Sequence, residues 1–248
     1  MDVTNIIIKR AADLQAKASQ IGRPVFTNFL DPSEQVALTA MRTGRDIKLS
    51  MWGGYLDAER KLAAFHPSDE APTNDDYPIT TVMLALPEGH GLLHRDFLGS
   101  IMALGIKREQ IGDIVLQPSG GAVLCGEGIA KYIEQNLAKV GNINTSITIM
   151  RPDDIVISQK QMKEVRGTVA SARLDAILSL ATKKFRGQTV AEIEGGLVNV
   201  NFKQVLDSSH RMKPGDIVSC RGFGRFEYVG DSGVTKKGRL SVTVKIYI

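Results

Sequence analysis

Hydrophobic positions in the last third of the chain recur first at helical spacing and then at strand spacing. Leu174, Ile177, Leu178 and Ala181 follow the i, i+3, i+4, i+7 pattern of a helix with one apolar face. A second short helix is predicted over residues 188–194. Alternation with period two then predicts the strands of a small sheet, over residues 197–202, 217–220, 221–228 and 240–246. This segment therefore reads as a helix pair followed by a sheet.

The middle of the chain alternates between short strands and helices. Strands are predicted over residues 80–86, 114–117, 122–125 and 147–150, and helices over residues 95–104 and 129–140. The resulting βαββαβ order is that of ferredoxin-like and RRM-like domains. An RRM stacks bases on aromatic side chains of its two central strands. Those strands lack Phe, Tyr and Trp here, so we expect a docking or protein-contact module.

The first 72 residues are predicted to be mainly helical. One helix is expected over residues 6–21, and Asp31-Pro32-Ser33-Glu34 carries the capping acid, proline and glutamate that start another. Linkers are expected over residues 68–78 and 151–170. The fold class is therefore α+β, with three domains: a mainly helical α/β domain over residues 1–74, an RRM-like domain over 75–152 and the helix-and-sheet domain over 168–248.

Charge is divided unevenly along the 248 residues. The net charge is +4, but residues 1–165 carry 17 Lys and Arg against 20 Asp and Glu, whereas residues 166–248 carry 14 against 7. A basic segment joined to a mildly acidic one is typical of a polyanion-binding domain on a separate scaffold. The pattern favours a nucleic-acid partner for the last third.

Other features limit the class of protein. Cys125 and Cys220 are far apart within apolar strand-like runs, which indicates buried, reduced thiols and not a disulfide framework. We find no signal-peptide core and no apolar run of about 18 residues that could span a membrane. A cytoplasmic protein without membrane, metal or cofactor is expected, and we expect it to be a monomer.

The last third resembles the S4 (αL-type) RNA-binding domain over residues 171–221. The residues that carry the resemblance are Arg173-Leu174-Asp175, Leu178, Arg186, Ile193, Gly196, Val198, Val200-Asn201 and Gly215-Asp216. Two positions depart from the family pattern. Phe185 stands where a serine is usual, and Phe202 stands where a glycine usually follows Val-Asn.

The whole chain resembles the YlmH-type bacterial S4-domain proteins. Further matching stretches are Phe26 to Pro32, Gly53 to Tyr55 with Ala58 to Arg60, Arg108 with Ile111 to Ile114, and Thr168 to Ser171 with Arg221 to Phe226. The resemblance implies a non-catalytic protein that binds rRNA and tRNA on the large ribosomal subunit. It also implies a role in translation quality control, in the rescue of stalled peptidyl-tRNA complexes.

Candidate RNA-binding residues are the cations of the last third and one aromatic residue: Arg173, Lys183, Lys184, Phe185, Arg186, Lys203, Arg211, Arg221, Arg225, Lys236, Lys237 and Arg239. Phe223, Phe226 and Tyr228 could also stack on unpaired bases if they are exposed, with core packing as the alternative.

Two other functions stay open at this point. S4 domains accompany RNA-modifying enzymes, so residues 1–165 could be the catalytic part of a pseudouridine synthase or a methyltransferase-like protein. We find neither a catalytic aspartate in such a context nor a methyl-donor loop. A protein-interaction adaptor is the third possibility, and it predicts no salt-dependent binding to RNA.

Overall fold

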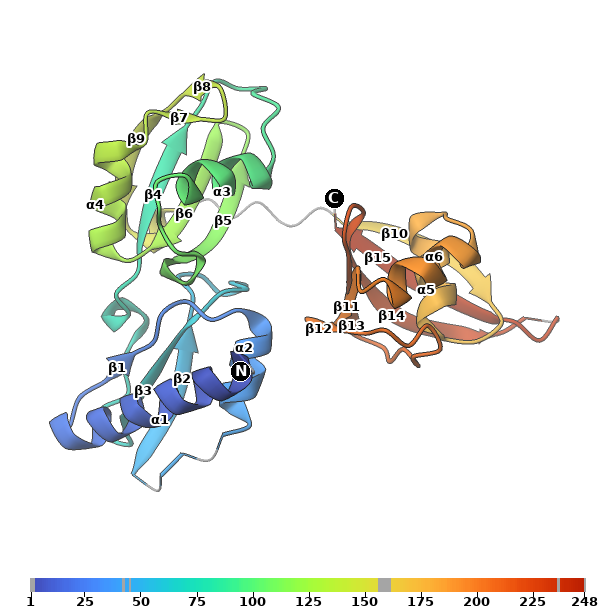
Figure 1. The fold of residues 1–248 in the computed structure, drawn as a ribbon, viewed down its shortest axis with the longest axis horizontal. Helices are drawn as coiled ribbons and strands as arrows, with labels where there is room; N and C mark the ends of the chain where they lie inside the picture. The colour runs from blue at the N-terminus through green and yellow to red at the C-terminus, as the bar shows by residue number, and fades with distance from the viewer. Residues whose placement is uncertain (1–2, 42, 45, 156–161, 236, 248) are drawn as a thin grey trace. The chain divides into compact units, whose positions relative to one another are not determined.

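The protein consists of two compact units, residues 1–158 and 159–248 (Figure 1). The computed structural model describes residues 3–41, 43–44, 46–155, 162–235 and 237–247. Each unit has its own helices, sheet and hydrophobic core, so the chain is mixed α+β. Within these described ranges, no helix combines the length and the apolar character needed to cross a membrane.

Unit 1 begins with a three-stranded antiparallel sheet in the order β1-β3-β2. The elements are α1 (Val3–Ile21), β1 (Val25–Phe26), α2 (Pro32–Thr39), β2 (Ile47–Trp52) and β3 (Leu62–Pro67). Ala11 and Ala18 of α1 and Leu38 of α2 form one buried cluster with Phe65 of β3. Both helices therefore pack on the same face of the sheet.

The start of α2 is the one that the sequence predicts, whereas the sheet beside it was not foreseen. Asp31 Oδ1 accepts a hydrogen bond from the Glu34 amide at 2.9 Å, and Glu34 Oε2 accepts one from the Asp31 amide at 2.6 Å. The mainly helical interpretation missed β2 and did not decide between helix and strand at β3. Residues 62–66 are all buried, because β3 is covered on both faces and so shows no alternation of polar and apolar positions.

The second part of unit 1 has the predicted βαββαβ order of elements. These are β4 (Thr80–Ala85), α3 (His94–Met102), β5 (Ile111–Gln117), β6 (Gly120–Cys125), α4 (Glu127–Asn136) and β9 (Ser146–Met150), with the short hairpin β7 (Lys139–Val140) and β8 (Ile143–Asn144) before β9. The sheet is antiparallel throughout, in the order β5-β6-β4-β9. The helix predicted to reach residue 140 ends at Asn136, because Leu137 takes an extended backbone conformation.

Both faces of this second sheet are covered. On one face, Phe97 and Ile101 of α3 and Ile133 of α4 pack against Val82 and Leu84. On the other face, Ala122 and Leu124 of β6 are fully buried in a cluster with Ile155, and Tyr55 of the preceding part packs against it. The second face is therefore closed by residues from outside the βαββαβ segment.

Asp113 joins the two parts of unit 1. Its Oδ2 accepts hydrogen bonds from the Tyr55 hydroxyl at 2.8 Å and the Glu59 amide at 2.6 Å, and its Oδ1 accepts one from the Arg60 amide at 3.0 Å. The Arg60 guanidinium donates to the carbonyl oxygens of Ile111 and Phe29, at 3.0 and 2.8 Å. One carboxylate and one guanidinium thus satisfy backbone groups on both sides of the joint.

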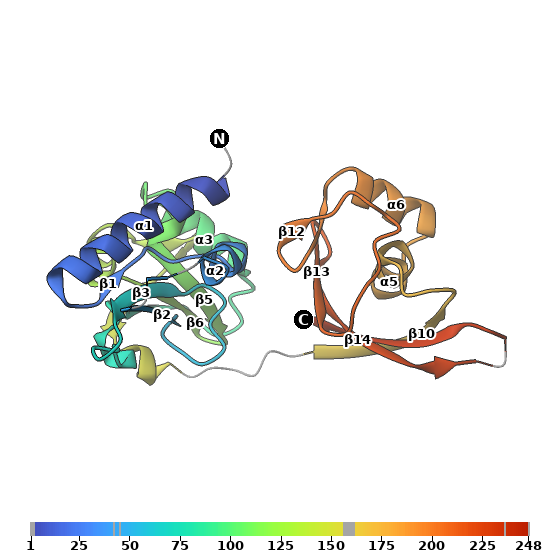
Figure 2. The ribbon, with the colours of Figure 1, turned by 90° about the horizontal axis from the view of Figure 1, so that it is seen from below.

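Unit 2 is a six-stranded antiparallel sheet with two helices on one face (Figure 2). Its strand order is β10-β15-β14-β13-β11-β12. The elements are β10 (Met162–Val169), α5 (Leu174–Thr182), α6 (Arg186–Glu194), β11 (Val198–Val200), β12 (Lys203–Gln204), β13 (Asp216–Cys220), β14 (Gly224–Val234) and β15 (Leu240–Tyr247). The helix pair and the strands at β11, β13 and β15 agree with the sequence prediction, whereas the strand expected over residues 221–228 begins at Gly224 and extends to Val234.

The linker expected over residues 151–170 was wrong for its second half. Met162–Val169 is strand β10, which pairs with β15 along its whole length, from Met162 opposite Tyr247 to Val169 opposite Leu240. Its outward positions are charged or polar and Gly167 interrupts the apolar pattern, so the strand is hard to recognise in isolation. A Cβ atom at Gly167 would lie 2.3 Å from Leu180 Cδ1 of α5, so a larger residue there would displace the Leu180 side chain.

Candidate nucleic-acid interface

The candidate RNA-binding residues lie in three parts of unit 2. Around the helices are Arg173, Lys183, Lys184, Phe185, Arg186 and Arg211; in the strands of the sheet are Lys203 and Arg225, on opposite faces; in the turns between strands are Arg221, Lys237 and Arg239. Lys236 lies outside the described residues. The set is therefore not one continuous surface.

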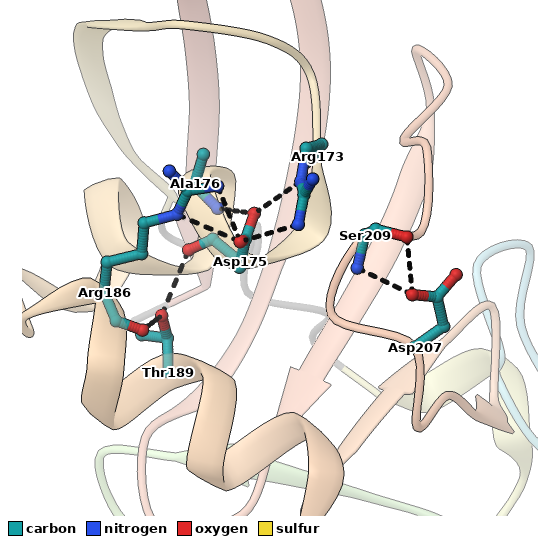
Figure 3. Close-up of polar contacts among 7 residues, drawn as sticks. All are labelled: Arg173, Asp175, Ala176, Arg186, Thr189, Asp207 and Ser209. Carbon is teal, nitrogen blue, oxygen red and sulfur yellow. Dashed lines mark hydrogen bonds and ion pairs between the residues drawn. The ribbon is translucent and has the colours of Figure 1, made fainter.

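Asp175, in the first turn of α5, organises the helical part and is only 2% exposed. Its Oδ2 accepts hydrogen bonds from Arg186 Nε and Nη2 at 3.0 and 2.8 Å, and from Arg173 Nη2 at 3.2 Å (Figure 3). Burial alone would raise the pKa of the Asp175 carboxyl, but hydrogen bonds and charge from Arg186 and Arg173 outweigh burial and lower it. Two guanidinium groups are thus held in place by one buried anion.

Backbone contacts complete this arrangement. The buried Thr189 hydroxyl of α6 lies 3.1 Å from the Asp175 carbonyl oxygen and 2.9 Å from that of Arg186, so it ties the two helices together. An isolated antiparallel bridge pairs Arg211 with Arg173. Asp207 is a second carboxylate at this site, and its pKa is lowered by hydrogen bonds from Ser209 and then by the charges of His210 and Arg173. Arg173 is thus influenced by two carboxylates, and Arg186 shares the first of them.

The turn between α5 and α6 presents an aromatic ring among cations. Phe185 is 83% exposed, and the Arg186 side chain is 56% exposed. Lys183 ends α5 with φ of 57°, the left-handed conformation common at helix C-termini. Lys184, in contrast, forms an ion pair with Glu192 of α6, and the hydrogen bond to Glu192 raises the pKa of Lys184. Phe185, Lys183 and Arg186 are thus the more accessible members of this turn.

A second aromatic and cationic pair lies at the β11–β12 turn. Asn201 and Phe202 have φ of 47° and 65°, as in a type I′ hairpin turn. Asparagine adopts this conformation readily, but a bulky side chain there costs about 1–2 kcal/mol. The Phe202 ring centroid lies 5.4 Å from Arg225 Cζ, a cation–π contact that contributes about 0.5–1 kcal/mol at a solvent-accessible site. The contact therefore offsets only part of the strain.

Core packing accounts for the other aromatic candidates. Phe226 and Tyr228 of β14 are fully buried beneath the helices, and Phe223 packs against the same cluster. They face the core because their strand alternates, which places Arg225 and Glu227 on the opposite face. Stacking of bases on Phe226 and Tyr228 is thus ruled out.

Buried polar residues that orient the cations, such as Asp175, were harder to recognise from the sequence than the cations themselves. A signal does exist, because an aspartate among the apolar residues of a helix start, with arginines two and eleven positions away, is typical of a buried ion pair. Asn201 and Asp216 are a second example. Asn201 Nδ2 donates to Asp216 Oδ1 at 2.8 Å, and Asn201 Oδ1 accepts from the Ile217 amide at 3.0 Å.

Comparison with known proteins relates unit 1 to a described family. Residues 4–70 match the family model "YlmH, N-terminal", and residues 72–154 match "Putative RNA-binding domain in YlmH". Arg60 lies in the first matched segment and Asp113 in the second, so the contacts between them join the two segments.

Individual relatives extend the similarity to most of the chain. The Bacillus subtilis (strain 168) "Ribosome-associated protein quality control protein P2" is 33% identical over 222 residues, which cover 89% of this chain and 86% of that protein. Among solved structures, "Cell division protein ylmH from Streptococcus pneumoniae" has a TM-score of 0.53 at 19% identity. That match covers 63% of this chain and 97% of the pneumococcal one, and it supports the fold alone.

Proposed function

The chain belongs to the YlmH family, and on that premise we propose that it is a non-catalytic, cytoplasmic RNA-binding protein that acts on the ribosome. We propose further that it works as a monomer, contacts rRNA of the large subunit together with tRNA, and takes part in the rescue of stalled peptidyl-tRNA complexes. In this proposal unit 2 is an S4-type domain that binds the RNA, and unit 1 determines which part of the ribosome the protein contacts.

The observation that carries the proposal is the arrangement around Asp175. Arg173 and Arg186 are oriented by a buried carboxylate and yet remain 38% and 56% exposed, so phosphate oxygens can reach their remaining N–H groups. Because the guanidinium groups are already held in position, little conformational entropy is lost when RNA binds. Phe185 adds an exposed ring next to this site, suited to stacking on an unpaired base.

The second sheet of unit 1 fits a docking role better than a second RNA-binding surface. In an RRM the sheet face away from the helices carries the aromatic residues that stack on bases. Here that face is apolar at Ala122 and Leu124, and Tyr55 and Ile155 pack on it. The description of residues 72–154 as a putative RNA-binding domain is compatible with RNA contacts elsewhere on this unit.

Sedimentation of the full chain with purified ribosomal subunits tests the proposal. The wild-type protein should move with the large subunit at low salt and dissociate as salt rises, because phosphate contacts release counterions. Arg211→Ala and Phe185→Ala should each weaken binding by roughly fivefold or more, from a lost phosphate contact and a lost stacking contact. Lys17→Ala, which removes an exposed cation of α1 outside residues 72–154, is the matched control and should leave binding unchanged.

Two results would contradict this function. The first is a wild-type protein that stays at the top of the gradient at every salt concentration. The second is binding to subunits that Arg211→Ala, Phe185→Ala and high salt all leave intact, which would indicate an adaptor that contacts ribosomal proteins only.

A further inference from the structure

We propose that the face of the unit 2 sheet away from the helices holds a second RNA site, at Phe202 and Arg225, that takes an unpaired base and its phosphate. This inference rests on the proposed function, and it specifies the kind of RNA bound: an element with at least one unstacked nucleotide. The site is separate from the arginines around Asp175, because the sheet lies between them.

Strand alternation places Arg225 on this face. Its neighbours Gly224 and Phe226 bracket it, and Phe226 is fully buried beneath α5 and α6, so the Arg225 side chain leaves the sheet in the opposite direction. Phe202 reaches the same face from the turn that follows β11, because its ring contacts the Arg225 guanidinium. Both residues are half-buried, so each keeps surface that a ligand can reach.

The residues beside the pair suit a nucleotide. One outward row runs across four strands, and cross-strand pairing sets its order as Gln204, Asn199, Ser219 and Arg225. The row contains amide and hydroxyl groups, which can hydrogen bond to base edges, and no carboxylate. Lys203 follows Phe202 directly but pairs with the inward-facing Val200, so its side chain leaves the sheet on the other face and Arg225 supplies the positive charge of this row.

The next outward row adds little attraction for a phosphate backbone. There Ile217 pairs with Glu227, Glu227 with Lys245, and Lys245 with Glu164. Lys245 lies between the two carboxylates, and Arg166 forms an ion pair with Glu164 at 2.7 Å, so the charges of this row largely cancel. The site is therefore centred on Phe202 and Arg225, whose planar groups suit an unstacked base.

The identity of residue 202 supports a binding role for its side chain. Glycine is the favoured residue at this turn position, and it adopts positive φ without steric cost. Phenylalanine is strained there, and strained backbone of this kind concentrates at functional sites. Its ring and the guanidinium offer adjoining planar surfaces, on which a base stacks whatever its sequence.

Fluorescence anisotropy of the full chain with two labelled RNAs tests the inference. One RNA is a hairpin with an unpaired loop, and the other is a blunt duplex with the same stem. Phe202→Gly should weaken binding to the looped hairpin by roughly five- to tenfold and leave binding to the duplex unchanged. Its thermal midpoint should match or exceed the wild-type value, because the substitution relieves the turn.

Three further variants complete the design. Arg225→Lys keeps the charge but loses the planar group, and it should show the same selective loss for the looped hairpin. Phe202→Tyr keeps the ring and should bind like the wild type. Val234→Ala removes an exposed apolar side chain from the β14–β15 hairpin and is the neutral control.

Each outcome separates this inference from the function on which it rests. If Phe202→Gly and Arg225→Lys bind the looped hairpin as tightly as the wild type, the second site does not exist, while the proposed function still stands on the arginines around Asp175. If these variants keep RNA affinity but lose affinity for intact subunits, the face contacts a protein and the inference fails. If the wild type binds neither RNA nor subunits, the proposed function itself fails.

Discussion

The Arg186 Nη2 atom lies 2.8 Å from Asp175 Oδ2, a carboxylate that is almost fully withdrawn from solvent while its partner is not. The pair spans the first turn of α5 and the first residue of α6. The same ion pair therefore joins α5 to α6 and orients the Arg186 guanidinium, a candidate RNA-binding group. Substitutions of Asp175 and of Arg186 can separate its effect on stability from its effect on RNA binding.

Asp175→Asn should destabilise unit 2 by about 2 kcal/mol, less than the ~3–5 kcal/mol for breaking a fully buried pair, because both arginine side chains can reach water. Amide hydrogen exchange in α5 and α6 measures the change. Glu194→Gln, at an exposed residue at the end of α6, should change stability by less than about 0.5 kcal/mol. Equal protection of α5 in the wild type and Asp175→Asn would contradict a structural role for the ion pair.

The Asp175 pair should also make unit 2 sensitive to acid. The folded state lowers the pKa of Asp175, so its stabilising contribution is fully present above the unfolded value of about 3.9 and is lost as the pH falls through the folded pKa. Urea unfolding of the wild type and Asp175→Asn between pH 7 and pH 3 checks this. The difference between the two should be constant near neutrality and shrink below about pH 4. A difference that grows in acid would have the wrong sign.

Lys183→Gly should make unit 2 more stable and a weaker RNA binder at the same time. Lys183 adopts φ of 57° at the end of α5, where glycine avoids a steric cost of about 1 kcal/mol. The substitution also removes an exposed cation, which should lower the salt dependence of RNA binding by about 0.7–0.9 in slope. Thermal unfolding and anisotropy measured on the same sample test both parts, with Lys131→Gly in α4 as a control that should destabilise unit 1.

Asp113→Asn should loosen unit 1 at its internal joint. An amide has one acceptor oxygen in place of two, so at least one of the donors from Tyr55, Glu59 and Arg60 loses its partner, at a cost of about 1–3 kcal/mol. Trp52 is the single tryptophan of the chain and lies in β2 of unit 1, so its fluorescence reports this unit selectively. Asp153→Asn, at an exposed position, should leave the unfolding curve unchanged.

The sequence predicts helices and strands best where one face is buried and the other is exposed to solvent. Residues 174–182 show this clearly, whereas β3, covered on both faces, has no periodicity to detect. Charge composition favours unit 2 as the RNA-binding part, but it does not say on which face of the sheet each cation lies. The structure shows that residues 224–228 form a strand paired with β13, so the neighbours Arg225 and Phe226 lie on opposite faces of the sheet. Arg225 therefore remains a candidate RNA-binding residue, whereas Phe226 is in the core.

The second sheet of unit 1 is covered on both faces, which limits where the chain can be cut into stable fragments. Gly54, at φ of 96°, approaches β6 so closely that a Cβ atom there would lie 2.1 Å from Leu124 Cδ2. A fragment that began at residue 72 would lose Tyr55 from the cluster around Ala122 and Leu124 and would leave Asp113 without its three donors. Such a fragment should aggregate, although it retains every strand of its sheet. The two family segments of unit 1 are therefore two halves of one folding unit, and neither half is a portable module.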